Sequence, residues 1–218
     1  MVLSGASDKF AAMNIELKEV SKRYGPQWIL KNINYKLSSN FVYGIRGANG
    51  SGKSTLLKMI SGFLSPSLGQ ISYSDSENSE ISRDEIYKKC SFWGPHVDLY
   101  GKLTVDEMIN YYFTFKGMRN SLSKEEFLDI MNLPVSRTRR VDSLSSGQVQ
   151  RLGLAMTILC DSELLLLDEP GSYLDIHALE WFSRLIKSNS KNRLIVIASN
   201  EENDLALSEV FLQIEDFK

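Results

Sequence analysis

A glycine-rich segment at residues 47–54, with the sequence GANGSGKS, places the strongest constraint on this chain. It fits the pattern G-x-x-x-x-G-K-S. The apolar run Phe41–Ile45 before it predicts a strand, and Lys53–Ile60 after it predicts a helix that ends at Gly62. Strand, glycine-rich turn and helix in this order are typical of a phosphate-binding loop. The sequence therefore predicts an α/β fold that binds a nucleotide.

The residue types in this loop suit phosphate chemistry. Glycines let the backbone turn tightly, so that successive N–H groups point at phosphate oxygens, and the helix start adds its positive end. Lys53 can reach the β- and γ-phosphates, and the Ser54 hydroxyl can ligate Mg²⁺. The pattern and its setting favour this function over a glycine-rich turn followed by a surface lysine. The residues expected to contact the nucleotide are Gly47, Asn49, Gly50, Ser51, Gly52, Lys53, Ser54 and Thr55.

An acidic pair follows the apolar run Leu164–Leu167. Four apolar residues that end in charge predict a buried parallel strand. Asp168 at its carboxyl end is expected to help hold Mg²⁺, and Glu169 to orient or deprotonate the water that attacks the γ-phosphate. An ordinary acidic strand end is the alternative, which the phosphate loop makes less favoured. Glu169 and Lys53 are thus the first candidate catalytic residues.

Length, charge and thiols narrow the class of protein. A chain of 218 residues suits one domain, 43% hydrophobic content suits a buried core, and a net charge of −2 gives no reason to expect nucleic acid as a partner. Cys90 and Cys160 are isolated, which favours a reduced cytoplasmic protein. No apolar stretch approaches the roughly 20 residues that span a bilayer. Residues 1–12 precede the first patterned stretch, and we expect a flexible extension there.

The pattern along the chain predicts a helical insert within an α/β core. Strands are expected around Ile15–Val20 and Ile33–Leu37, and again at Glu163–Leu167 and Leu194–Ala198. Residues 72–84 are polar and predict an exposed loop. Capping-box spacing predicts helices after Thr104 and after Ser123. We therefore assign residues 13–96 and 161–218 to the core and residues 97–160 to a helical subdomain.

The segment Leu144–Gln148, LSSGQ, stands between the phosphate loop and the acidic pair, with a predicted helix from Val149 to Leu159 after it. In this order the motifs resemble the ATP-binding-cassette (ABC) ATPase family, from about Ile15 to the C-terminus. The resemblance implies a P-loop NTPase (RecA-like) core with an N-terminal antiparallel β-subdomain and an inserted α-helical subdomain. It also implies ATP and Mg²⁺ as cofactors.

The resemblance gives LSSGQ a role between two protomers. Ser145, Gly147 and Gln148 would bind the phosphates of an ATP held by the neighbouring protomer's loop. Ser145 as a simple helix cap is the alternative, and it is compatible with phosphate contact. Ser172–Asp175 resembles the loop by which two such domains touch, although it also fits a turn and helix start. Tyr24 matches the aromatic residue that stacks on adenine, with a core or turn tyrosine as the alternative.

Two positions depart from the family pattern. The glutamine that touches Mg²⁺ and the attacking water aligns with His96, in a stretch where the alignment is uncertain by a residue. Histidine can ligate metal or donate a hydrogen bond, but a loop histidine without a catalytic role is also plausible. The family's histidine after the strand Leu194–Ala198 is replaced by Asn200, which can donate to phosphate but carries no positive charge. We expect Asn200 and His96 to contribute to the catalytic site and turnover to be slow.

These features together predict the ATP-hydrolysing subunit of an ABC transporter, peripheral at the cytoplasmic face of the membrane. Two protomers would close around two ATP molecules, and a separate transmembrane permease would receive the motion. The alternatives are a soluble ABC ATPase that acts as an assembly or regulatory clamp, and a binding module that scarcely hydrolyses ATP. Parts of the stretch Gly94–Thr104 are similar to haem-exporter ATPase subunits of cytochrome c maturation, which fixes no cargo.

Overall fold

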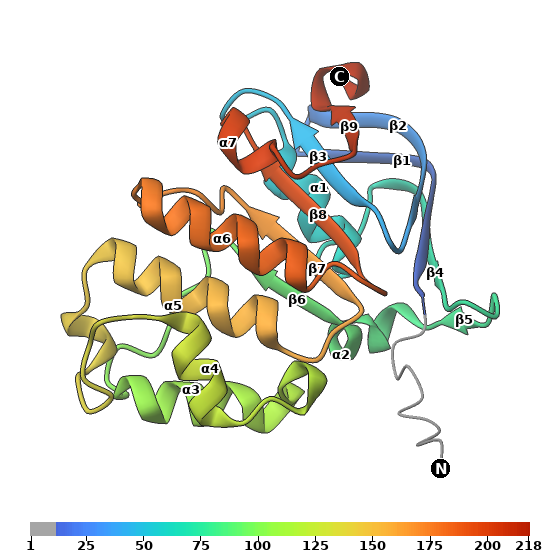
Figure 1. Cartoon of the computed structure of the whole chain (residues 1–218). Coiled ribbons are helices and arrows are strands. Elements are labelled where there is room, and N and C mark those ends of the chain that lie inside the picture. Colours follow the sequence, from blue (N-terminus) through green and yellow to red (C-terminus); the bar gives the residue numbers. More distant parts are fainter. Residues whose placement is uncertain (1–11) are drawn as a thin grey trace, which may run out of the picture.

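Two β-sheets with helices packed on them form the protein in the computed structural model, which describes residues 12–218 (Figure 1). The five-stranded sheet is parallel, in the order β6-β7-β8-β3-β9, and the four-stranded sheet is antiparallel, in the order β2-β1-β4-β5. The strands are β1 (Asn14–Tyr24), β2 (Gln27–Ser38), β3 (Val42–Arg46), β4 (Leu68–Ser74), β5 (Glu80–Ile81), β6 (Cys90–Trp93), β7 (Leu164–Asp168), β8 (Leu194–Ser199) and β9 (Val210–Gln213). The helices are α1 (Lys53–Ile60), α2 (Ile86–Lys89), α3 (Val105–Lys116), α4 (Lys124–Met131), α5 (Ser146–Leu159), α6 (Ile176–Ser188) and α7 (Glu202–Leu205).

The antiparallel sheet confirms the two strands predicted near the N-terminus, since β1 pairs with β2 along its length. The loop predicted for residues 72–84 is wrong in part. β4 continues to Ser74 beside β1, and the short β5 then pairs back onto β4. The segment is polar because most of β4 lies at the surface, whereas Tyr73 is buried against the core. One buried residue is too few to produce a period-two hydrophobic pattern.

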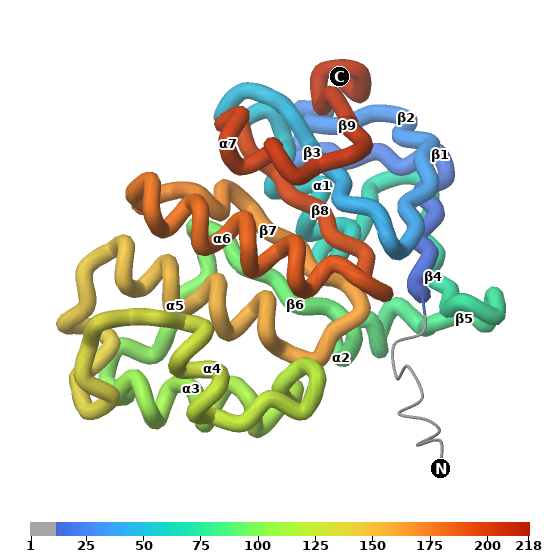
Figure 2. Tube along the Cα trace, viewed as in Figure 1, coloured from blue at the N-terminus to red at the C-terminus, as the bar shows by residue number. Residues whose placement is uncertain are grey.

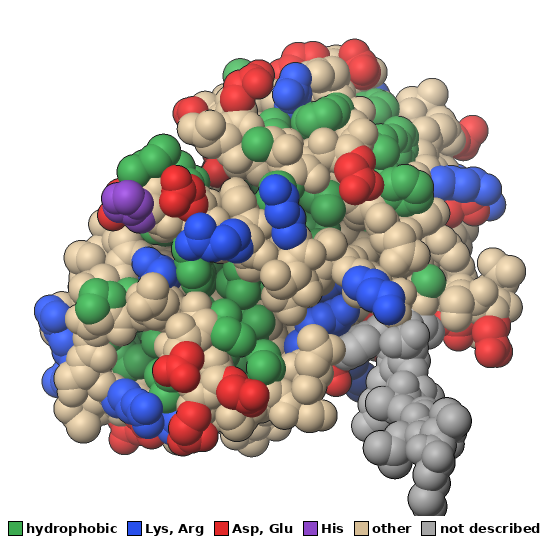
Figure 3. Space-filling view, in the orientation of Figure 1, with side chains coloured by type: hydrophobic (Ala, Val, Ile, Leu, Met, Phe, Trp, Pro, Cys, Tyr) green, Lys and Arg blue, Asp and Glu red, His purple; other side chains and the backbone are tan. Residues whose placement is uncertain are grey.

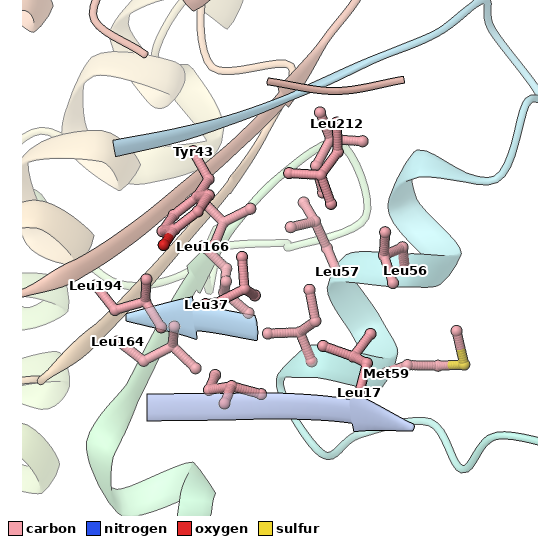
Figure 4. Close-up of a cluster of buried hydrophobic side chains, with 14 of the residues drawn as sticks. Leu17, Leu37, Tyr43, Leu56, Leu57, Met59, Leu164, Leu166, Leu194 and Leu212 are labelled. Carbon is pink, nitrogen blue, oxygen red and sulfur yellow. The ribbon is translucent and has the colours of Figure 1, made fainter. Parts of the chain in front are cut away.

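The leucine run of β7 supplies both faces of the parallel sheet. Leu164 and Leu166 pack with α1 and the antiparallel sheet, where Figure 4 shows the cluster, and Leu165 and Leu167 pack with the helices on the opposite face. Successive side chains of a strand alternate between faces, so a strand covered on both sides must be apolar throughout. The predicted buried parallel strand is confirmed.

Helices make up the regular elements between residues 97 and 160, apart from isolated bridges at Thr104 and Met118. Figure 1 shows α3, α4 and α5 gathered on the side of the parallel sheet away from β1, β2 and β4. Both predicted capping boxes are present, at Thr104 for α3 and at Ser123 for α4. α5 begins at Ser146, earlier than the predicted Val149, because Ser145 forms a third capping box.

The surface, the cysteines and the N-terminus complete the description of the fold. Over residues 12–218, no helix combines the length and apolar character needed to cross a membrane. Charged side chains of both signs are interspersed on the face seen in Figure 3. Cys90 and Cys160 are buried and unpaired with each other. The extension predicted for residues 1–12 lies outside the described residues apart from Ala12.

Candidate nucleotide-binding site

The loops that follow the parallel strands converge on one pocket of about 780 Å³. Because β8 lies between β7 and β3, the chain leaving β8 passes between the acidic pair and the phosphate loop, as Figure 2 shows beside α7. Open parallel sheets bind ligands at this carboxyl edge. The predicted site residues that line the pocket are Tyr24, Asn49, Gly50, Ser51, Gly52, Lys53, Ser54, Thr55, Glu169 and Asn200.

The phosphate loop has the backbone that its sequence predicts. Gly50 and Gly52 have φ values of 75° and 109°, a region that residues with a Cβ rarely adopt. Gly52 is the N-cap of α1, so the helix start faces the pocket without an acidic residue in its first turn. Gly47 does not line the pocket. A Cβ there would lie 2.1 Å from the Ile214 side chain, so this glycine lets the loop pack on the C-terminal 3-10 helix Ile214–Phe217.

Lys53 lies inside the loop and is 5% exposed. Its Nζ donates to the carbonyl oxygens of Gly47, at 2.7 Å, and Ala48, at 3.2 Å. The same nitrogen lies 3.2 Å from Oε1 of Glu169. The lysine charge is therefore held at the pocket by neutral acceptors and one carboxylate.

Glu169 begins the loop after β7 with a left-handed φ of 49°. Its backbone N–H donates to the Ala198 carbonyl at 2.7 Å, which holds the residue against β8. Its Oε2 accepts a 2.9 Å hydrogen bond from the Ser199 hydroxyl. A positive φ costs conformational energy in a residue with a Cβ. Glu169 keeps this conformation because its backbone and side-chain contacts hold it in place.

Asp168 lies deeper, at 1% exposed, and burial raises the pKa of its carboxyl, while a hydrogen bond from Ser54 acts in the opposite direction. Its Oδ1 is buried without a hydrogen-bond partner among the described atoms. A hydroxyl beside an unsatisfied carboxylate oxygen suits Mg²⁺, which takes oxygen ligands and retains several waters. Ser54 and Asp168 therefore have the donor chemistry that this ion takes, and no group of three or more His, Cys, Asp and Glu residues that could hold a metal occurs within residues 12–218.

His96 is exposed and does not line the pocket. β6 ends at Trp93, and the next residue, Gly94, is so close to Asp168 that a Cβ there would lie 2.7 Å from the aspartate side chain. The chain therefore presents Pro95 to the pocket, one residue before the predicted position. Asn200, at the second departure from the family pattern, does line the pocket.

The LSSGQ segment lies apart from the pocket of its own chain, since Ser145, Gly147 and Gln148 are absent from the lining. Ser145 is exposed, its Oγ accepts from the Gln148 N–H at 3.3 Å, and its own N–H donates to the Gln148 side chain at 3.0 Å. A Cβ on Gly147 would lie 2.8 Å from the carbonyl of Tyr173. The segment caps α5 and touches the loop 172–175, and both predicted roles of Ser145 are sterically available.

Tyr24 and Tyr173, which belongs to the loop 172–175, are both solvent-accessible. Tyr24 ends β1, is 51% exposed, and has Lys22 Nζ 5.3 Å from its ring centroid. It lines the pocket, so its ring face is available for a base. Tyr173 is 75% exposed, and Asp175 two residues later caps α6 through the Ala178 N–H at 2.8 Å. The loop 172–175 is thus a helix start that presents an aromatic ring outward.

Sequence reasoning missed Ser199 and Asp204. The Ser199 hydroxyl contacts Glu169 and lies 2.6 Å from Oδ2 of Asp204, which is 2% exposed. No local pattern marks this contact, because it depends on β7 and β8 being neighbours. The one available signal was a polar residue at the end of an otherwise apolar strand.

Comparison with known proteins agrees with this geometry. The family model described as ABC transporter matches residues 30–172. A bacitracin transport ATP-binding protein of Bacillus licheniformis is 32% identical over 84% of the chain and 60% of its own length. A spermidine/putrescine import ATP-binding protein of Clostridium acetobutylicum is 31% identical over 91% of the chain and 57% of its own length. The chain thus spans little more than half the length of these relatives.

Solved structures share the fold over almost their whole length. An ABC transporter ATP-binding protein from Pyrococcus furiosus is similar with a TM-score of 0.79 and 25% identity, covering 94% of this chain and 99% of the other. A bacterial ABC transporter cassette solved as a dimer has a TM-score of 0.74 and 26% identity, covering 92% and 94%. The same cassette has also been solved in a post-hydrolysis state bound to ADP and phosphate. The P-loop core with its antiparallel and helical additions is confirmed.

Proposed function

The chain belongs to the ABC transporter family of ATP-binding proteins, and from this we propose that it is an ATP-hydrolysing transporter subunit that works as a dimer. One observation carries the proposal: the pocket holds Lys53 and Glu169, while Ser145 and Gly147 lie outside it. A signature segment that is remote from its own phosphate loop suits the ATP of a second protomer, identical or different. The dimeric cassette among the similar structures supports the same arrangement.

In this proposal each residue of the site contacts a particular part of the bound ATP, the metal ion or the attacking water. Tyr24 stacks on the base, and the backbone of residues 49–55 together with Lys53 binds the phosphates. Mg²⁺, held by Ser54 and Asp168, supplies charge neutralisation at the phosphates. Glu169 orients the attacking water and accepts its proton, and Asn200 donates to a phosphate oxygen.

A separate membrane protein is the proposed recipient of the motion, with the subunit at the cytoplasmic face. An exposed aromatic cluster, consisting of Tyr100, Tyr111 and Phe115, supports a docking surface on α3 beside the loop of His96. The ring centroids lie 5.1 Å and 5.2 Å apart, and Phe115 is 71% exposed. Contiguous exposed aromatic side chains mark interaction sites. Helices 97–160 would then move as the unit that transmits closure.

The docking proposal is tested by affinity purification from detergent-solubilised membranes. Phe115→Asp should lose an integral membrane protein that wild type retains, and the ATPase of the isolated chain should stay within about twofold. Phe63→Asp is the control, because Phe63 is 83% exposed but lies after α1, outside the cluster. Equal retention by both variants would rule out the aromatic cluster as the docking site.

Hydrolysis is tested by the steady-state ATPase rate of wild type against Glu169→Gln. We expect the glutamine variant to lose about 10²-fold or more in kcat while it still binds ATP, because the amide cannot accept the water's proton. Equal ATPase rates in wild type and Glu169→Gln would rule out ATP hydrolysis as the function.

A slowly hydrolysing ATP clamp is the second candidate. Pro95 and Asn200 favour it, because Pro95 lines the pocket in place of the predicted His96 and Asn200 lines it where the family has a histidine. A kcat well below the roughly 1 s⁻¹ common among enzymes, together with a long-lived ATP-bound dimer, would favour the clamp.

A further inference from the structure

The Glu169 carboxylate has two side-chain partners in the described part of the chain, Lys53 and Ser199. If the chain binds ATP as proposed above, Lys53 turns toward the phosphates and its ion pair with Glu169 weakens. The Ser199 hydroxyl then becomes the side-chain contact that keeps the carboxylate aimed at the attacking water. What holds Ser199 therefore decides how well Glu169 is placed.

The hydrogen bonds around Ser199 cannot all be satisfied if both neighbouring carboxyls are ionised. Its Oγ lies 2.9 Å from Oε2 of Glu169 and 2.6 Å from Oδ2 of Asp204, and it accepts from the Glu201 N–H at 3.0 Å. A hydroxyl has one hydrogen to donate and two lone pairs to accept with. One of the two carboxyls must therefore be the donor to Ser199.

Asp204 is the better donor. Both carboxyls line the pocket, but Asp204 is 2% exposed, whereas Glu169 lies beside the Lys53 ammonium. An ionised carboxylate with a cation at 3.2 Å is stabilised, and a buried one without such a partner is not. With Asp204 protonated, Ser199 accepts from Asp204 and from the Glu201 N–H and donates to Glu169, so that every group is satisfied.

Asp204 also reaches the loop after Glu169. The Gly171 N–H donates a hydrogen bond to its carboxyl, and a Cβ on Gly171 would lie 2.0 Å from its Oδ1. The aspartate thus holds the end of β8 and the start of the loop 170–175 together, with Glu169 between them.

We propose that Asp204 is a positioning residue for hydrolysis: as a neutral acid it donates to Ser199, which donates to Glu169, and this chain of hydrogen bonds keeps the carboxylate aimed when Lys53 engages ATP. The inference rests on the proposed ATPase function. It assigns a role to a side chain that acts through Ser199 and Glu169 and does not contact the reacting atoms itself.

The experiment compares kcat and KM for ATP in wild type, Asp204→Ala, Asp204→Asn, Ser199→Ala and Ser199→Thr. The alanine variants should lose about tenfold in kcat, with KM within about twofold, since one hydrogen bond of ordinary strength is removed. Asp204→Asn should restore most of the rate, because its NH₂ donates to Ser199 and its carbonyl accepts from Gly171. Ser199→Thr should keep the rate, because the hydroxyl remains.

A second measurement does not depend on activity. Infrared difference spectroscopy at neutral pH should show a protonated carboxyl band in wild type that is absent from Asp204→Asn, whose folding is checked by thermal melting. Absence of the band in wild type overturns the inference, as does an asparagine variant that is as slow as the alanine one, or alanine variants at full rate. Wild type no faster than Glu169→Gln would overturn the proposed function itself, a result that none of the other outcomes resembles.

Discussion

Two buried carboxyls dominate the site at the scale of single residues. Asp168 and Asp204 are 1% and 2% exposed, and burial is the first cause that raises the pKa of each. Burial raises the pKa because water no longer stabilises the ionised form. Burial of these two carboxyls therefore lowers the stability of the nucleotide-free protein at pH values where they are ionised.

The stability difference between Asp204→Asn and wild type should depend on pH. A raised pKa in the folded state gives stability that is full below the ordinary value of 3.8 and is lost as the pH rises through the folded-state value. Glu169 and Glu201 raise the pKa further. The asparagine has no such loss, so its advantage in urea unfolding should grow with pH across this window and then level off. A difference that stays constant from pH 4 upward would contradict the raised pKa.

Asn200→His should raise the rate of hydrolysis. Asn200 lines the pocket and is exposed, so an imidazole fits there without repacking a core. A histidine can carry positive charge near its ordinary pKa of about 6.5 and contact the γ-phosphate. We expect kcat to increase about tenfold, with the gain largest below pH 7. Asn200→Ala is the matched control, and an equal rate in both variants would show that the position does not touch the phosphate.

Helix α5 links two parts of the site at the scale of elements. Near its start, Gln150 donates to the Pro170 carbonyl at 2.7 Å and accepts from Trp93 Nε1 at 2.9 Å. At its end, the fully buried Arg193 donates to the Ile158 carbonyl. The helix therefore connects the signature segment at its start to the loop that follows Glu169.

Ser145 and Ser123 both form capping boxes, so a comparison of the two serines distinguishes helix capping from phosphate contact. Ser145 caps α5 and Ser123 caps α4, both through the N3 residue. Ser145→Ala and Ser123→Ala should each lower the free energy of unfolding by about 1 kcal/mol. Only Ser145→Ala should also lower the ATPase, by about tenfold or more, because its hydroxyl would face the partner's ATP in the proposed dimer. Matched ATPase losses in the two variants would leave Ser145 as a cap alone.

The proposed divided active site belongs to the scale of the whole molecule and its dimer. Lys53→Ala removes the phosphate contact, and Ser145→Arg blocks the signature segment. Each variant alone should be inactive. In an equal mixture, half of the dimers combine the two chains, and each has one intact composite site. About one quarter of the wild-type rate should therefore return if protomers pair at random.

The ATPase rate of the mixture can be interpreted only if the two variants exchange subunits and form mixed dimers. Fluorescent labels on the two variants should report mixed dimers in the presence of ATP. Mixed dimers without recovered activity would mean that each chain completes its own site, and the composite arrangement would be wrong.

Local patterns in the sequence determined the phosphate loop, the buried strand Leu164–Leu167 and the capped helix starts, because each depends on neighbours within a few residues. The same patterns missed β4, because most of its residues are exposed and show no alternation of apolar and polar side chains. They also missed the length of α6, because the motif Ser172–Asp175 indicates only its start. Residue type alone could not show that Pro95, one position before His96, reaches the pocket.

Only the tertiary structure decided which strand ends are neighbours. The strand order places β8 between β7 and β3, so Ser199 meets Glu169 across 30 residues of sequence and Asp204 closes the hydrogen bonds behind it. Pairing between distant strands follows from how both faces of a sheet are covered, which no short window of sequence contains. The nucleotide-binding residues could therefore be predicted from the sequence itself. The hydrogen bonds that hold the Glu169 carboxylate depend instead on the pairing of β7 with β8.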